Sequence, residues 1–441
     1  MRPKRRGPDG VPTNLGLATL WRVFRAQPPS FWFLCFYLMF EYVRPQVAYP
    51  QLDILPWGQA MLGLAVVSFI LEGGVLRLST PAPLLLAVFA SLILLSSAAA
   101  YDPSYSWSRL HEFYTWPIVY LVITNIVTTQ RRLLLFLGAF LAFNFKMSLF
   151  ATRSWAAIGF VWRDWGVAGA PGWFQNSGEF GIEMCVFFPL SLFVILGLRP
   201  QLKPWQFITL LGVPASALVG MIASSSRGAI LGGVAVLLWM VLLSKHRIRA
   251  LLGGAVAFAL IVAITPPEQK ARLRESGTDY TSTTRLTYWR RGIEMANSHP
   301  VLGIGYANWI PYYAAHYDGP VQVCHNIFVQ VSSELGYTGL MGFLAMIACT
   351  FALNRRTRKL AKRVGERGRF MGSVARGLDG ALIGYLVSGS FVTVLYYPYF
   401  WINLSFTAAA NIIARGPLQQ PDPAPRSPAL VAQPSLNRAT T

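Results

Sequence analysis

The residues most capable of chemistry lie in a polar and aromatic segment, residues 284–334, of a chain that is otherwise mostly apolar. Helical spacing places Arg285, Tyr288 and Trp289 on one helix face, because residues three and four apart are neighbours on a helix surface. His325 follows at the start of the next apolar run. Guanidinium groups bind phosphate oxygens and aromatic rings stack on sugars, so the segment suits an anionic, sugar-bearing substrate.

A helix is predicted over residues 284–298, ending before Pro300, because the residue that precedes a proline disfavours helical geometry. This helix carries a basic cluster of Arg285, Arg290 and Arg291. We interpret Arg290 as a charge on the solvated face. Arg285 shares its face with the two aromatic rings and is predicted to clamp a phosphate, and Arg291 is predicted to contact the substrate.

His325 is the candidate base, and Asn326 beside it is a predicted substrate contact. At the start of a helix, the helix dipole and the neighbouring arginines both lower the pKa of an imidazole. The resulting neutral ring can accept a proton from a hydroxyl group. A single histidine is more often structural than catalytic, and spacing alone does not choose between the two readings.

Arg227 lies in a short link between two apolar runs, residues 224–229. One interpretation is an arginine that extends its charge to the membrane surface. The other is an anion ligand, because this link is expected to face outward and opens a helix whose N-terminal amides attract anions. The serines of the link lack a GxSxG pattern, which argues against a serine nucleophile.

Carboxyl groups form a second set of candidates. Glu179 and Glu183 are four residues apart at the start of an apolar run, where they could position sugar hydroxyls or a proton, although acids are common at helix starts. Glu179 is predicted to bind substrate together with Asn176. Glu41 and Lys146 fall inside apolar runs, where ionisable residues are functional hypotheses.

Composition defines the class of protein. The chain has 441 residues, of which 54% are hydrophobic and only 13% are charged. The net charge of +20 lies in short links between apolar runs, as orientation in a membrane requires, and therefore does not indicate nucleic-acid binding. The four cysteines have no metal-ligand spacing, and neither a metal site nor a cofactor is predicted.

The predicted fold is all-α: a polytopic integral membrane protein with about twelve transmembrane helices. A basic cytoplasmic N-terminus (1–30) precedes transmembrane helices 1–9 (31–265). A long periplasmic loop that contains a helix (266–324) leads to transmembrane helices 10–12 (325–415) and a disordered tail (416–441). The spans are predicted near 31–43, 55–71, 82–98, 116–128, 133–150, 179–197, 206–223, 228–243, 250–265, 325–353, 378–395 and 400–414.

Lysine and arginine residues orient this fold. The segment 354–377 is strongly basic and is predicted to be a cytoplasmic anchor. Both termini are then cytoplasmic, and Arg227, His325 and the long loop face the periplasm. The predicted location is the bacterial inner membrane.

Several short motifs together resemble the bacterial O-antigen ligase and polysaccharide polymerase superfamily. The resemblance covers roughly residues 170 to 350, and each motif alone is weak. An earlier loop, residues 172–176, is similar to a loop of the family, although Ser177-Gly178 departs from the family's usual pattern. The remaining motifs are Ser226-Arg227-Gly228-Ala229, Arg285-Leu286-Thr287-Tyr288-Trp289, the stretch 299–305, and His325-Asn326 running to Glu334-Leu335-Gly336.

The resemblance implies a metal-independent, inverting glycosyltransferase whose donor is an undecaprenyl-diphosphate-linked glycan. It implies that Arg227 and Arg285 bind the diphosphate and that His325 activates the acceptor hydroxyl. The acceptor is the lipid A core in a ligase, which we favour slightly, or a growing glycan in an O-antigen or exopolysaccharide polymerase. Membrane lipids are further expected partners.

A transporter or flippase of polysaccharide is an alternative of another class. It would use Glu41 or Lys146 in a site at the membrane midplane. Such proteins have broken helices and internal symmetry, neither of which we detect in the sequence.

Overall fold

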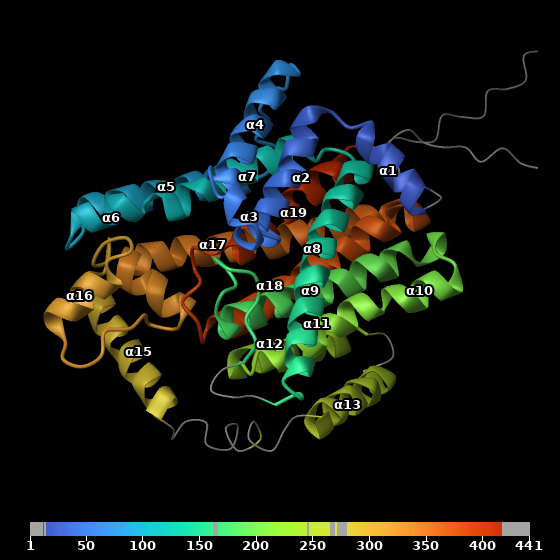
Figure 1. Ribbon diagram of the computed structural model, residues 1–441. Helices are drawn as coiled ribbons and strands as arrows, with labels where there is room; N and C mark the ends of the chain where they lie inside the picture. The colour runs from blue at the N-terminus through green and yellow to red at the C-terminus, as the bar shows by residue number, and fades with distance from the viewer. Residues whose placement is uncertain are drawn as a thin grey trace, which may run out of the picture.

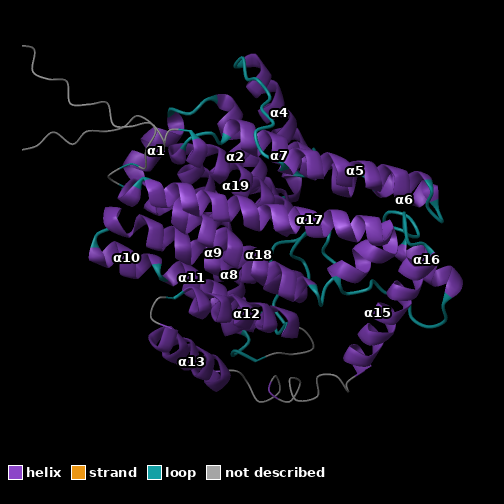
Figure 2. Cartoon of the chain, turned by 180° about the vertical axis from the view of Figure 1, so that it is seen from behind, coloured by secondary structure: helices purple, strands orange, loops and turns teal. Residues whose placement is uncertain are grey.

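The protein is described from a computed structural model, which covers residues 12, 15–161, 166–244, 247–264, 270 and 280–416. Within these residues the secondary structure is helical and contains no strand (Figure 2). The all-α prediction is therefore confirmed for the described part of the chain. The tail predicted to be disordered lies outside it from residue 417 onward.

Each of the twelve predicted spans contains a helix (Figure 1). Within the described residues, four helical segments are long and apolar enough to cross a membrane, at Gln130–Ala157, Ser177–Gln201, Pro204–Ala223 and Ile327–Arg363. Shorter apolar helices lie at Trp57–Leu71, Ala82–Ala98 and Arg227–Leu243. The number of spans thus stays a prediction. The helices that matter below are α2 (Pro29–Tyr42), α5 (Ala82–Ala98), α6 (Pro103–Arg109), α7 (His111–Ile126), α8 (Gln130–Ala157), α9 (Ser177–Leu198), α11 (Gly212–Ala223), α12 (Arg227–Leu243), α15 (Tyr280–Ser298), α16 (Trp309–His316), α17 (Ile327–Arg363), α18 (Arg369–Gly389) and α19 (Pro398–Arg415).

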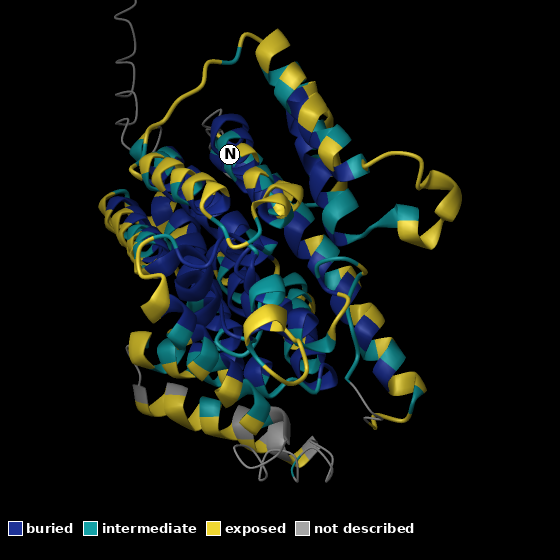
Figure 3. Cartoon of the chain, turned by 90° about the vertical axis from the view of Figure 1, so that its left-hand side faces the viewer, coloured by how far each residue is buried: buried dark blue, intermediate teal, exposed yellow. Residues whose placement is uncertain are grey.

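Helix α9 lies at the centre of the bundle, packed against α8, α11, α12 and α18. Its contact with α18 is close because α18 carries Gly380 and Gly384 four residues apart, the small-residue spacing that brings membrane helices together. A Cβ atom at Gly384 would lie only 2.8 Å from the backbone oxygen of Cys185. Large apolar side chains remain exposed on the outer helices, as lipid contact requires, while buried residues gather inside the bundle (Figure 3).

Helices α5 and α6 lie at the same end of the bundle as α15 and α16 (Figure 1). The backbone amide of Tyr101 donates to the oxygen of Ile304 at 2.9 Å, and that of Asp102 donates to the Asn308 side chain at 2.7 Å. Ser106 donates to the backbone oxygen of Tyr306 at 2.6 Å. The loop predicted from the sequence is therefore bound to the N-terminal half of the chain.

We detected no broken helix in the sequence, and for α17 this was wrong. At Gly336 the backbone has φ 69° and ψ −174°, a conformation that glycine adopts readily. The loop that follows α15 supplies hydrogen-bond donors to carbonyl groups at the interruption of the helix. The backbone amides of Ile304 and Gly305 donate to the carbonyls of Ser333 and Glu334 at 2.9 and 3.2 Å. The break therefore anchors the loop beside the site described next.

Candidate functional site

Three segments distant in the sequence meet near residues 391–393, between α18 and α19. Gly228, the second residue of α12, lies so close that a Cβ atom there would be 3.0 Å from Cβ of Phe391. The Trp289 ring of α15 is 6.1 Å from the Phe391 ring, between centroids. The backbone amide of His325 donates to Thr393 Oγ1 at 2.7 Å. The structure therefore brings the start of α12, the face of α15 and His325 to one place.

Arg227 is half-buried at the first position of α12. Ser226 caps the helix, because its side chain accepts a hydrogen bond from the amide of Ala229 at 3.3 Å. Ser225 precedes the cap with a positive φ of 53° and turns the chain into the helix. The guanidinium thus starts from a helix end whose amides and dipole already favour an anion.

Arg285 and His325 interact electrostatically. Burial and, second, the charge of Arg285 lower the pKa of His325 from its ordinary 6.5 to about 4. Trp289, one turn after Arg285, donates from Nε1 to the backbone oxygen of Cys324 at 3.1 Å. This bond holds α15 against the residue before His325, so a neutral imidazole lies next to a fixed positive charge.

This environment predicts an unusual pH dependence of the reaction. Since the imidazole stays neutral until the pH approaches about 4, kcat/KM should not fall as the pH passes through 6.5, and its acid limb should bend near pH 4. Folding stability should decline as the pH falls below 6.5, because the unfolded chain then binds a proton that the folded chain does not. A pH–rate profile measures the first effect. A bend near 6.5 would contradict the burial of the base beside Arg285.

Two predicted contacts on the loop also have partners within the protein, and their contact with substrate stays a prediction. The Tyr288 ring is buried in the core of the loop, and its hydroxyl donates to the backbone oxygen of Pro320 at 2.8 Å. Arg291 pairs with Glu294 at 3.1 Å and lies over the Tyr317 ring at 4.5 Å. Both residues shape the loop that carries Arg285.

Asn326 caps α17. Its side-chain oxygen accepts hydrogen bonds from the amides of Phe328 and Val329 at 2.8 and 3.2 Å. This cap fixes where α17 begins. His325, with its positive φ of 53°, lies just before the cap and outside the helix.

Asn176 and Glu179 lie at the start of α9. The Glu179 carboxylate accepts the amide of Asn176 at 3.1 Å and the hydroxyl of Tyr397 at 3.0 Å. The Asn176 side chain is exposed, whereas Glu179 is buried. Through Tyr397 the pair contacts the segment that leads from Thr393 into α19.

A cavity of about 800 Å³ of empty space adjoins the site. Cys324 and Thr393, which flank and contact His325, both line it. Its buried carboxyl group belongs to Glu334, which accepts the hydroxyl of Tyr396 at 3.0 Å. The sequence prediction gave Glu334 no role, although Glu334 stands in the motif that follows His325.

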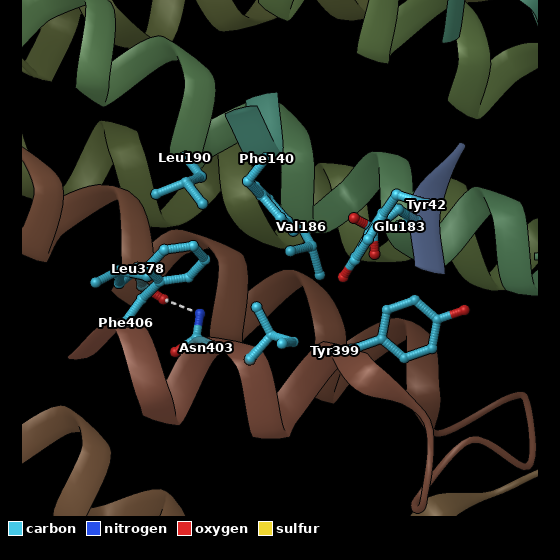
Figure 4. Close-up of a pocket in the computed structure, with 10 residues that line it drawn as sticks. Tyr42, Phe140, Glu183, Val186, Leu190, Leu378, Tyr399, Asn403 and Phe406 are labelled. Atoms are coloured by element: carbon cyan, nitrogen blue, oxygen red, sulfur yellow. Dashed lines mark hydrogen bonds between the residues drawn. The ribbon is translucent and has the colours of Figure 1, made fainter. Parts of the chain in front are cut away.

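A smaller cavity, with about 230 Å³ of empty space, lies inside the bundle (Figure 4). The carboxyl group of Glu183 borders it together with Tyr42, Tyr399 and Asn403. Glu183 is fully buried one helical turn below Glu179. Figure 4 places its carboxyl beside Tyr42 of α2.

In the part of the chain that the structure describes, no three His, Cys, Asp or Glu side chains are grouped so that they could hold a metal ion. Metal independence stays a prediction to be tested with chelator.

Part of the chain is similar to a known family. A family model described as O-antigen ligase matches residues 214–344, which include Arg227, Arg285 and His325. The chain carries an O-antigen ligase family domain, and the resemblance stated above is confirmed. Together with the apolar helices, this match indicates a multi-pass protein of the bacterial inner membrane.

One protein to which the chain is similar is a curated O-antigen ligase of Pseudomonas aeruginosa. It is 29% identical to this chain over 175 residues, which are 36% of this chain and 37% of that protein. The chain thus matches little more than a third of that relative's length. A similarity of this extent is compatible with a ligase and with a polymerase.

Proposed function

We propose that this protein transfers a glycan from an undecaprenyl-diphosphate donor to an acceptor hydroxyl at the periplasmic face of the membrane. The observation that carries the proposal is the meeting of the α15 face, the start of α12 and His325 at residues 391–393. The charge of Arg285 contributes to lowering the pKa of His325 there. Arg227 is placed at the neighbouring helix start, against the segment that binds His325. Fixed cations and a base are the groups that displacement of a diphosphate requires.

The proposed step is a single displacement. The acceptor oxygen forms a bond to the anomeric carbon while His325 takes the hydroxyl proton. The bond from that carbon to the diphosphate oxygen breaks, and its electron pair leaves with the undecaprenyl diphosphate. Arg227 and Arg285 stabilise this charge, so the leaving group needs no proton. Because a single displacement attacks from the side opposite the leaving group, the anomeric configuration is inverted.

We place transfer to a lipid A core ahead of polymerisation, which uses the same chemistry with a glycan as acceptor. The Pseudomonas aeruginosa relative is an O-antigen ligase, which favours the ligase. A knockout separates the two: loss of a ligase leaves full-length lipid-linked polymer, whereas loss of a polymerase leaves single repeat units.

The direct test uses purified protein in detergent with a lipid-linked glycan donor and a lipid A–core acceptor. Transfer is expected without any ion gradient, and an excess of EDTA should leave its rate unchanged. Absence of transfer from an active donor pool to either type of acceptor would reject the proposal. Strong inhibition by EDTA would reject the metal-free mechanism.

A further inference from the structure

The cavity beside His325 has two walls of different origin. Gln330, Glu334 and Trp309 come from the loop and from α17, inside the matched segment 214–344. Arg109 and Glu112 come from α6 and α7, outside that segment. The family resemblance therefore assigns nothing to the second wall.

The cavity has the chemistry of a sugar pocket. Arg109 donates to Glu112 at 2.7 Å, and its guanidinium lies 5.3 Å from the Tyr105 ring centroid. Trp173, Tyr396 and other aromatic side chains line the remaining surface. Carboxylates and an arginine accept and donate to sugar hydroxyls, while aromatic faces cover apolar sugar faces.

The charges that line the cavity do not favour the diphosphate. Arg109 is the arginine among its lining residues and is paired with Glu112, while the remaining carboxyl group, that of Glu334, is buried and accepts the hydroxyl of Tyr396. A phosphate is attracted instead at the start of α12 and beside Arg285. The two sides of His325 thus differ: a basic side for the leaving group, and an aromatic side with a paired arginine for an uncharged sugar.

We propose that this cavity binds the uncharged terminal sugar of the acceptor and that Arg109 and Glu112 determine which sugar is accepted. The inference rests on the proposed function, because that function supplies an acceptor. Since Cys324 and Thr393 line the cavity and adjoin His325, a sugar held there lies beside the base. The acceptor side of the reaction is then selected by the N-terminal half of the chain.

The test is a binding measurement that needs no transfer. The full-length protein in nanodiscs is titrated with two probes: a lipid A–core glycolipid without O-antigen and an undecaprenyl-diphosphate-linked single repeat unit. Whichever of them is the acceptor should bind the wild type. Arg109→Ala and Glu112→Gln should each weaken that binding by about tenfold, the effect of losing one charged hydrogen bond. Both side chains are partly exposed, so the variants should fold.

Two controls complete the experiment. Arg290→Ala removes a surface arginine of α15 that pairs with Glu294, and it should leave binding unchanged. Sugar-free undecaprenyl diphosphate should bind all variants equally. Unchanged affinity for both glycolipids in the Arg109 and Glu112 variants would overturn the inference, as would weaker binding of the sugar-free lipid. If the wild type binds an acceptor glycolipid in this pattern but never transfers glycan, the proposed function fails while the pocket assignment stands.

Discussion

The His325→Ala variant is expected to transfer glycan about 10²–10⁴-fold more slowly than the wild type, because a positioned general base contributes that much. An acceptor hydroxyl is a weak nucleophile, and the neutral ring held beside Arg285 can take its proton. Single-turnover transfer with purified protein measures the loss directly. Donor affinity should stay near the wild-type value, because the imidazole does not bind the diphosphate in the proposed step.

His316→Ala is the matched control. That ring is exposed and stacked on Tyr312, with centroids 4.0 Å apart, and it has no place in the proposed step. Its transfer rate should equal that of the wild type. A His325→Ala protein with normal rates would remove the base from the mechanism.

Replacing either Arg227 or Arg285 by alanine should lower the transfer rate by about 10²–10³-fold, as loss of one fixed electrostatic partner does. The reason is that the diphosphate gains charge as it leaves, and each guanidinium stabilises that charge. Lysine keeps the charge but loses the planar fork, so Arg285→Lys should fall between alanine and wild type.

Arg285→Ala has a second expected effect that separates it from a folding defect. With the guanidinium gone, the pKa of His325 should rise from about 4, although burial still holds it below 6.5. The acid limb of the residual activity should therefore move to higher pH. Arg290→Ala, on the same helix but exposed and paired with Glu294, should change neither the rate nor this limb. Equal losses in the Arg285 and Arg290 variants would contradict the assigned role.

Local sequence patterns predicted most helices well, because apolar runs and their breakers are local signals. Helix α5 spans 82–98 as predicted, and α15 ends at Ser298, before Pro300. Helix α16 was not predicted, since its aromatic residues have no clear apolar period. The break at Gly336 was missed because its stability depends on a loop more than thirty residues earlier.

The site shows a similar division. Arg227, Arg285 and His325 could be chosen from residue type and expected exposure, yet nothing local indicated that residues 391–393 would join them. Residue type alone could not show that the Asn326 side chain caps α17 or that the Tyr288 ring packs in the core of the loop. Their contact with substrate stays a prediction. The cavity wall formed by Arg109 and Glu112 was not predicted, because it comes from helices distant in the sequence from His325.

The most direct test of the shared site is an experimental structure of the protein with undecaprenyl diphosphate bound. The account predicts that the diphosphate lies between the guanidinium groups of Arg227 and Arg285, with oxygens about 2.7–2.9 Å from their nitrogens. His325 should face the sugar end of the lipid. A diphosphate bound elsewhere, for example at the basic cytoplasmic end of α17, with Arg227 and Arg285 untouched, would contradict it.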